Sequence, residues 1–171
     1  MKPDYQIALS KLNILEVLKD FTPVVIGTPP LQIATEDSDI DIACSTEELD
    51  SFQGYLNDNF GHLSKFQSHK YVREKIPTIL TSFFAYEWEF EIFCQNIPVS
   101  NQWGVRHFHI EQRLLSLVPC LREKVIGLKQ QGIKTEPAFA QILGLKGDPY
   151  QAMIDLETLS DQDLLKLPNR I

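Results

Sequence analysis

The stretch that decides the fold is Val24-Val25-Ile26-Gly27-Thr28, followed after an irregular segment by Ser38-Asp39-Ile40-Asp41-Ile42. The first three residues form an apolar run that ends at a glycine, which predicts a short buried strand. In the second segment isoleucine alternates with aspartate, and this period of two predicts a strand with one apolar and one acidic face. Asp39 and Asp41 therefore project from the same face, with their carboxylates close together.

Two carboxylates at this spacing raise each other's pKa unless a cation neutralises them. Magnesium is the natural partner, because it takes one or two carboxylates and completes its shell with water and phosphate oxygens. The alternative is an ordinary acidic pair on an edge strand. The upstream Gly27-Thr28 element favours a site, since such a loop can present amides and a hydroxyl group to phosphates.

A third carboxylate for a metal centre occurs further along the chain. Between Glu87 and Phe93 glutamate alternates with apolar residues, so Glu87, Glu89 and Glu91 share one face of a predicted strand. Glu91 has apolar neighbours on both sides, which is typical of a carboxylate set into a sheet, whereas Glu87 lies near a predicted turn. Glu89 is the alternative to Glu91 as the third acid.

The remaining periodicity predicts an α+β chain. We expect a helix over 4–21, a helix from a capping box at Ser45–Glu48 to Gly61, and strands over 79–85 and 88–93 paired around Tyr86-Glu87. Five helical segments are expected after Pro98, with Thr135, Asp148 and Ser160 as caps, over 106–117, 120–131, 136–143, 149–158 and 161–167. These elements predict a short mixed sheet flanked by helices over residues 1–100, with an all-helical region over 101–171 packed on that core.

The composition is that of an ordinary globular protein, with 171 residues, 43% hydrophobic and 23% charged. The formal net charge of -7 excludes a generic basic nucleic-acid coat and generic DNA binding. The charge is uneven, because residues 61–135 carry ten basic and six acidic side chains, so a local basic groove stays compatible with it. No apolar run approaches the roughly 20 residues that span a bilayer, and the start is no signal peptide, so we expect a cytoplasmic protein without a membrane partner.

The cysteines indicate neither a disulfide framework nor a structural zinc site. Cys44, Cys94 and Cys120 are an odd number without the spacing of a metal-binding pair. Cys44 and Cys94 each follow an acidic site residue by three positions. They should therefore face away from the acidic side of their strands, as small buried hydrophobes.

Two further groups of polar residues are candidate neighbours of the site. Positive charge would be added if the strand that carries Lys65, Lys70, Arg73 and Lys75 flanks the site, although a solvated strand face is the simpler interpretation. On the helix expected over 106–117, the candidates are His107, Glu111 and Arg113. A hydrogen-bonded polar face is the simplest interpretation of that cluster, and a contact to a base or acceptor is the alternative, because no third or fourth ligand completes a zinc site.

Together, these segments resemble the nucleotidyltransferase superfamily with the DNA polymerase β-like fold. Its signature is an apolar strand ending in Gly-Gly or Gly-Ser, then Asp-x-Asp or Asp-x-Glu, then a carboxylate on a later strand between apolar residues. The matching residues here are Val24–Thr28, Ser38–Ile42 and Glu91–Phe93. The whole chain is similar to a small bacterial branch that carries only a domain-of-unknown-function label, over the stretches Val25–Cys44, Phe90–Gln95, His107–Leu115 and Thr135–Tyr150.

The resemblance implies a magnesium-dependent nucleotidyltransferase. Asp39, Asp41 and Glu91 would be the catalytic residues and would hold one or two magnesium ions, or manganese in their place. Gly27, Thr28 and Ser38 would bind a nucleoside triphosphate. The hydroxyl group of an acceptor, which is a small molecule, an RNA or a protein, would attack the α-phosphate and release pyrophosphate.

Pro29 and Pro30 depart from the superfamily pattern. Its members usually continue the glycine turn into a helix whose amides bind phosphates, and proline has no amide hydrogen. In addition, Leu31-Gln32 replaces an Arg-Gly pair that small members often carry. The alternative hypothesis is therefore a catalytically weak or inactive member of the fold. Such a protein would act as a nucleotide-binding or protein-interaction module, including a toxin or antitoxin component.

Overall fold

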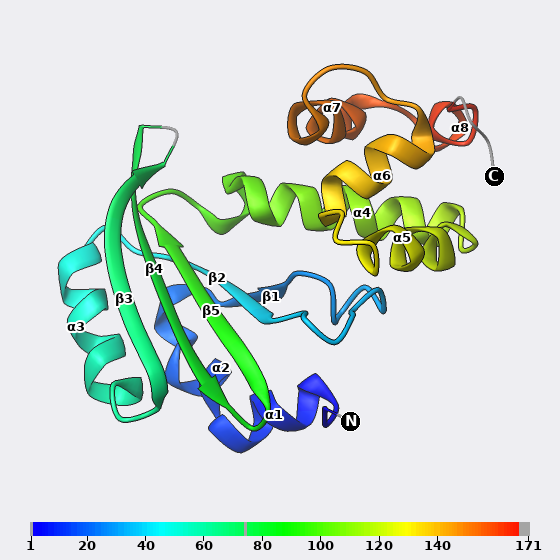
Figure 1. Cartoon of the computed structure of the whole chain (residues 1–171). Coiled ribbons are helices and arrows are strands. Elements are labelled where there is room, and N and C mark those ends of the chain that lie inside the picture. The colour runs from blue at the N-terminus through cyan, green and yellow to red at the C-terminus, as the bar shows by residue number, and fades with distance from the viewer. Residues whose placement is uncertain (1, 74, 168–171) are drawn as a thin grey trace. The chain divides into compact units, whose positions relative to one another are not determined.

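The structure is a computed structural model that describes residues 2–73 and 75–167. The chain divides into two compact units (Figure 1). The first unit comprises Met1–Pro29 and Ser38–Val105, and it contains the β-sheet. The second unit comprises Pro30–Asp37 and Arg106–Ile171, and its regular elements are helices. No helix among the described residues is both long enough and apolar enough to cross a membrane.

The first unit has a mixed five-stranded sheet in the order β1-β2-β5-β4-β3. β2 and β5 pair in parallel, and the other neighbouring strands pair antiparallel. The strands are β1 (Val24–Ile26), β2 (Ile40–Ser45), β3 (Ser64–Arg73), β4 (Ile76–Ala85) and β5 (Trp88–Gln95). The predicted hairpin is confirmed, because Tyr86 and Glu87 connect β4 to β5 with positive φ angles of 50° and 65°, the sign that tight hairpin turns require.

Helices cover one face of this sheet. They are α1 (Tyr5–Leu12), α2 (Ile14–Val17), the short 3₁₀ helix η1 (Lys19–Phe21) and α3 (Leu49–Phe60) (Figure 1). β2 and β5 contribute alternate residues to the core beneath them: Ile40, Ile42, Cys44, Phe90, Ile92 and Cys94. Burial raises the pKa of the Cys94 thiol to about 12, as expected for a small buried hydrophobe. Because side chains alternate along a strand, the acidic residues of β2 and β5 point to the other face.

Two predicted helix boundaries in this unit are wrong. The single helix expected over 4–21 is interrupted at Asn13, which has a left-handed conformation (φ 50°) that asparagine tolerates better than most residues. The capping box at Ser45 does not form, because the pairing of β2 with β5 continues through Ser45 and the amide of Thr46 donates to Gln95 O at 3.3 Å. α3 therefore begins only at Leu49, and it ends at Gly61 as predicted.

The 3₁₀ helix η2 (Val99–Asn101) belongs to the first unit, and the boundary between the units falls within α4 (Trp103–Leu117), after Val105. The rest of the second unit after α4 consists of short helices. Asp148 and Ser160 cap their helices as predicted, by accepting from the amides of Gln151 and Asp163. The predicted cap at Thr135 is wrong, because Lys134 occupies the cap position and Thr135 already belongs to the first turn. The other elements are α5 (Leu121–Lys129), α6 (Thr135–Leu143), α7 (Pro149–Asp155), η3 (Leu156–Thr158) and α8 (Asp161–Leu164). Residues 168–171 of the predicted helical region lie outside the described residues.

Phe83→Ala is expected to lower the free energy of unfolding by about 3–5 kcal/mol, as measured by urea denaturation. The Phe83 side chain is 1% exposed and stacks on Phe60 and Phe90, each with a centroid distance of 5.2 Å. Phe84→Ala is the matched control, because Phe84 lies on the opposite face of β4 and is 37% exposed. Its loss should be less than about 1 kcal/mol, and equal losses for the two variants would contradict this orientation of β4.

Candidate functional site

Three carboxylates converge on the sheet face opposite the helices. Parallel pairing of β2 with β5 places Asp41 directly beside Glu91, and Asp39 immediately precedes β2. The carboxylate oxygens of Asp39, Asp41 and Glu91 all lie within 4.8 Å of one another, and the three side chains are half-buried. Within residues 2–73 and 75–167, no other set of three histidine, cysteine or acidic side chains has this geometry.

This triad of Asp39, Asp41 and Glu91 suits a hard divalent cation. Its donors are all carboxylate oxygens, which magnesium and manganese prefer over the nitrogen and sulfur ligands that favour softer metals. Burial raises the pKa of Glu91 above its usual value, and the negative charges of Asp39 and Glu89 raise it further. A bound cation would oppose both effects, because it stabilises the ionised carboxylates.

Gly27 is required by the position of the Asp41 carboxylate. Ile26, the last residue of β1, pairs with Asp41, so the turn that follows β1 passes directly beside that side chain. A Cβ atom on Gly27 would overlap Asp41 Oδ2, and Gly27 also has a positive φ of 78°. Both the backbone conformation and the close approach therefore exclude a side chain at this position.

Contacts around Ser38 hold the residue that precedes Asp39. Thr28 Oγ1 donates to Ser38 Oγ at 3.0 Å, which joins the turn after β1 to the start of β2. Lys2 Nζ donates to Ser38 O at 2.7 Å and lies 4.5 Å from the centroid of the Trp88 ring. The indole of Trp88 in turn donates to Pro3 O at 2.9 Å. Lys2 was missed by the sequence reasoning, because a single lysine far upstream of the motif carries no spacing signal.

The strand residues predicted as neighbours of the site lie on different faces of the sheet. Glu89 shares the face of Glu91 but is exposed and is not part of the triad. Lys70 points to the other face, where it pairs with Asp50 of α3. The guanidinium of Arg73 lies over the Phe93 ring, 5.8 Å from its centroid, and Phe93 follows Glu91 by two residues on the same face. Arg73 therefore extends toward the triad, whereas Lys70 does not.

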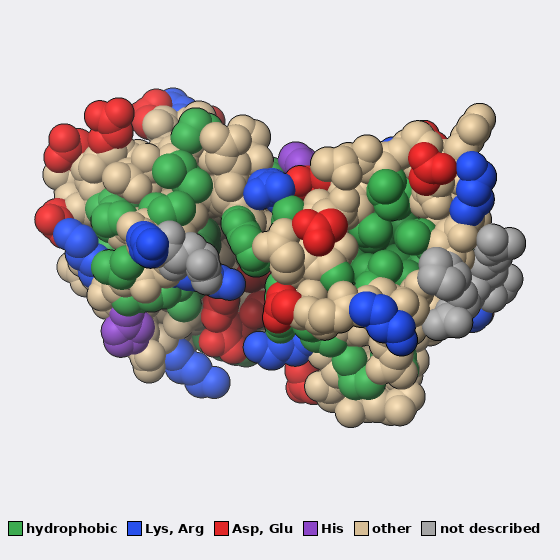
Figure 2. Space-filling view, turned by 90° about the horizontal axis from the view of Figure 1, so that it is seen from above, with side chains coloured by type: hydrophobic (Ala, Val, Ile, Leu, Met, Phe, Trp, Pro, Cys, Tyr) green, Lys and Arg blue, Asp and Glu red, His purple; other side chains and the backbone are tan. Residues whose placement is uncertain are grey.

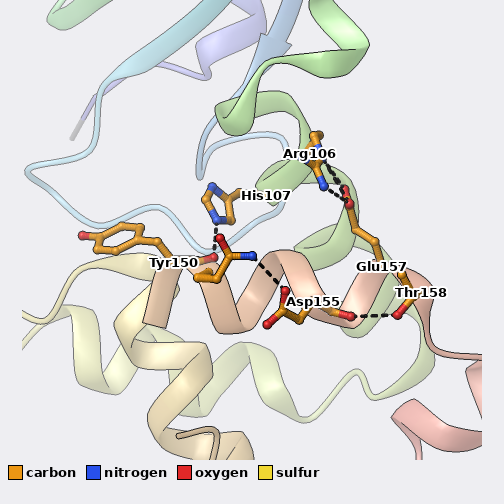
Figure 3. A network of polar contacts seen from close by, with 7 residues as sticks. Arg106, His107, Tyr150, Asp155, Glu157 and Thr158 are labelled. Carbon is orange, nitrogen blue, oxygen red and sulfur yellow. Dashed lines mark hydrogen bonds and ion pairs between the residues drawn. The ribbon is translucent and has the colours of Figure 1, made fainter. Parts of the chain in front are cut away.

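Two of the candidates on α4, His107 and Arg113, make polar contacts within the second unit, and Figure 3 shows those around His107. His107 Nε2 lies 2.9 Å from Tyr150 O, and its Nδ1 lies 3.8 Å from Glu136 Oε1. Arg113 donates to Asp161 Oδ1 and Leu159 O, both at 2.7 Å. These contacts, and the ion pair of Arg106 with Glu157, join α4 to α6, α7, η3 and α8.

Glu111 is buried to the same extent as His107, with 5% of each residue exposed. Burial raises the pKa of Glu111 well above the usual value, Glu136 raises it further, and Lys129 opposes the shift. Glu111 and His107 do not form a metal-ligand cluster with a third described residue.

The space-filling view in Figure 2 shows acidic and basic side chains interspersed with hydrophobic ones, in keeping with the mixed composition.

Glu91→Gln is expected to make the metal-free protein more stable than the wild type at neutral pH. Because the folded-state pKa of Glu91 is raised above 4.5, the folded protein binds this proton more tightly than the unfolded chain does. Wild-type stability is therefore lost as pH rises above 4.5 through the folded-state pKa, and the glutamine variant lacks this loss. The measurement is urea unfolding in EDTA at several pH values.

The difference between Glu91→Gln and the wild type should vanish below pH 4.5, where both states of the wild type are protonated. Glu87→Gln is the control, because Glu87 is exposed in the hairpin turn and lies outside the triad. A Glu91→Gln variant that is less stable than the wild type at neutral pH would contradict the electrostatic description of the site.

Gly27→Ala is expected to displace the Asp41 carboxylate and to weaken binding of Mg²⁺ or Mn²⁺ in calorimetric titrations. The left-handed backbone alone should cost about 1–2 kcal/mol of stability. Gly54→Ala is the matched control, because a Cβ at Gly54 in α3 meets nothing within 4 Å. That control should keep cation binding and be stabilised by about 0.5–1 kcal/mol. Equal cation affinity in the Gly27→Ala variant and the wild type would show that the close approach to Asp41 is unimportant.

Solved structures with a similar fold are nucleotidyltransferases. Cid1 poly(U) polymerase in its MgGTP-bound form gives a TM-score of 0.57 at 16% identity, covering 82% of this chain and 47% of that chain. A cytoplasmic RNA terminal U-transferase gives 0.53 at 17% identity, with coverages of 82% and 41%. A chain of the GLD-2/RNP-8 complex gives 0.51 at 16% identity, with coverages of 78% and 53%. The protein thus spans about half the length of these structures, and the likeness confirms the predicted nucleotidyltransferase fold.

Sequence comparison places the chain in a family. No curated protein matches it. A family model described as a domain of unknown function, DUF4269, matches residues 7–156. Because the match covers most of the 171 residues, the chain belongs to the DUF4269 family, as a protein with the nucleotidyltransferase fold.

Proposed function

We propose that this protein is a magnesium-dependent nucleotidyltransferase that moves a nucleoside monophosphate from a nucleoside triphosphate to an acceptor hydroxyl group. The observation that carries the proposal is the convergence of Asp39, Asp41 and Glu91 within 4.8 Å on one face of this fold. Structures with the same fold include a poly(U) polymerase bound to MgGTP and an RNA terminal U-transferase. Their names support a transfer of this class without identifying the substrates here.

The three carboxylates have distinct roles in the proposed reaction. Asp39 and Asp41 would hold the cation, which when bound neutralises negative charge on the phosphates and in the transition state. Glu91 would complete the ligand set nearest the acceptor and orient or deprotonate its hydroxyl group. The acceptor oxygen then forms a bond to the α-phosphorus, the bond from that phosphorus to the leaving oxygen breaks, and pyrophosphate departs.

The turn after β1 would bind the phosphates mainly through hydroxyl groups. Pro29 and Pro30 supply no amide hydrogen, so we assign phosphate contacts to the hydroxyl groups of Thr28 and Ser38, which already lie 3.0 Å apart. Gly27 lets the backbone pass close to Asp41 and hence close to a cation bound there. In this assignment Lys2 fixes the Ser38 carbonyl.

The two proline residues favour a second candidate function, a module that binds nucleotide or a partner protein with little or no catalysis. Two missing amide donors would weaken triphosphate binding or displace it from the in-line position. This candidate uses the same triad and the same sheet. It differs from the enzyme in one measurable respect, because it releases no pyrophosphate.

Wild-type protein is expected to show magnesium-dependent stabilisation by at least one nucleoside triphosphate in thermal-shift and calorimetric measurements. A ligand at one hundred times its Kd stabilises by about 2.7 kcal/mol. Asp39→Asn and Asp41→Asn should each weaken this binding by tenfold or more, since each removes a charge from the cation site. Glu87→Gln is the control with the same loss of charge outside the triad. Absence of cation-dependent binding of any of the common triphosphates would contradict the proposal.

The transfer step is tested by pyrophosphate release in the presence of candidate acceptors. Glu91→Gln should weaken triphosphate binding less than the Asp39 and Asp41 variants do, while its turnover falls by about 100-fold or more, the scale of a lost acid–base group. Magnesium-dependent triphosphate binding without pyrophosphate release, across small-molecule, RNA and protein acceptors, would favour the binding module over the enzyme.

A further inference from the structure

The sheet face that carries the triad continues across β4 to β3. Along β5 and β4 the register pairs Glu91 with Ser82 and Phe93 with Leu80. On β3, His69 pairs with Leu80 and Tyr71 with Thr78. Because alternate residues share a face, His69, Tyr71 and Arg73 lie on the same side as Glu91. The helices α1, α2 and α3 pack on the other side, as the pairing of Lys70 with Asp50 also shows.

Aromatic and cationic side chains alternate over this face. The guanidinium of Arg73 lies 5.8 Å from the centroid of Phe93, and Lys65 Nζ lies 5.3 Å from that of Phe84. Tyr71 and Phe84 are each 37% exposed, which is high for rings on a sheet. Lys65 and Arg73 are the basic residues of β3 on this face, because Lys70 points to the other side, and β3 carries no acidic residue. The open face is defined here as Lys65, His69, Tyr71, Arg73, Phe84 and Phe93.

Phe93 is the residue of the open face that lies beside the triad. Phe93 follows Glu91 by two positions on β5, which is about 7 Å along the strand. β3 lies two strands from β5, which is about 10 Å across the sheet. A ligand whose reacting group lies at Glu91 therefore meets Phe93 and Arg73 first and Tyr71 next.

We propose that the open face binds a single-stranded nucleic acid as the acceptor of the transfer reaction. Aromatic rings that stack on bases, interleaved with cations that meet phosphates, are the features that bind single strands on sheet surfaces. Phe93 and Tyr71 stack on bases, and Arg73, whose guanidinium lies over Phe93, contacts the backbone phosphates. The terminal sugar hydroxyl group lies at Glu91, where its oxygen attacks the α-phosphate, its proton leaves and pyrophosphate departs. The acceptor role rests on the function proposed above, but the binding surface does not.

The test measures fluorescence anisotropy of short, labelled, unstructured RNA and DNA oligonucleotides at low ionic strength, in EDTA and without triphosphate. Wild-type protein is expected to bind, and Tyr71→Ala and Arg73→Ala should each weaken binding by about tenfold or more. Arg73→Ala should also reduce the slope of log affinity against log salt by about 0.7, the value for one lost phosphate contact to a single strand. The RNA and DNA arms identify which strand the face prefers.

Two matched controls separate the open face from general charge and exposure. Lys70→Ala removes the same charge from the same strand on the opposite face. Tyr86→Ala removes a ring that is 44% exposed and lies against Lys11 of α1. Both controls should bind oligonucleotides as the wild type does. No binding by the wild type, or an equal loss in Lys70→Ala and Arg73→Ala, overturns the proposal, and wild-type binding only to a protein would identify the face as a protein-docking surface instead.

The oligonucleotide-binding measurement tests the open face separately from the triad. Oligonucleotide binding in EDTA requires no cation at the triad, because the open face does not include the cation ligands. Oligonucleotide binding without magnesium-dependent triphosphate binding would overturn the proposed function and leave the open face as a nucleic-acid site. Triphosphate binding with pyrophosphate release but no oligonucleotide binding would overturn the open face alone, and the acceptor would then belong to another class.

Discussion

The parallel pairing of β2 with β5 is the constraint on which the site depends. These strands are far apart in the sequence, and only their shared register places Asp41 beside Glu91. The same register stacks Ile40 on Phe90 and Ile42 on Ile92 on the buried face, so the hydrophobic core and the acidic site are two faces of one ladder. A slip of one residue would exchange those faces and put carboxylates into the core, which is energetically prohibitive. Apolar burial thus sets the geometry of the charged groups.

This coupling explains how much of the fold and site could be predicted. Both the strand β2 and its acidic face are predictable from the alternation over residues 39–42, because a period of two is a local property of the sequence. The preference for Glu91 over Glu89 also came from local apolar flanks, and the two differ in the structure, since only Glu91 joins the triad. The hairpin at Tyr86 and Glu87 was predictable for the same reason.

What could not be predicted depends on contacts between distant residues. Lys2 reaches Ser38, and Arg73 reaches Phe93 across β4, and neither pair has a spacing that a sequence pattern would reveal. Helix boundaries failed where such contacts compete with local signals. The capping sequence at Ser45 starts no helix, because the backbone of Ser45 is paired with Gln95 of β5 in the sheet. The polar character of His107 on α4 was predictable. Its partners Glu136 and Tyr150 were not, because they reach His107 only when α6 and α7 pack against α4.

The segment before α1 has a consequence for how the protein is handled. Lys2 is hydrogen-bonded to Ser38, which precedes β2, and Pro3 is hydrogen-bonded to Trp88, the first residue of β5. Lys2 and Pro3 therefore act as a clamp, meaning that they join the segment before β2 to the start of β5, although they lie outside every regular element. Proteolytic trimming or a bulky peptide fused directly ahead of Lys2 acts on the same clamp, and an inactive preparation altered in this way would say little about the triad itself.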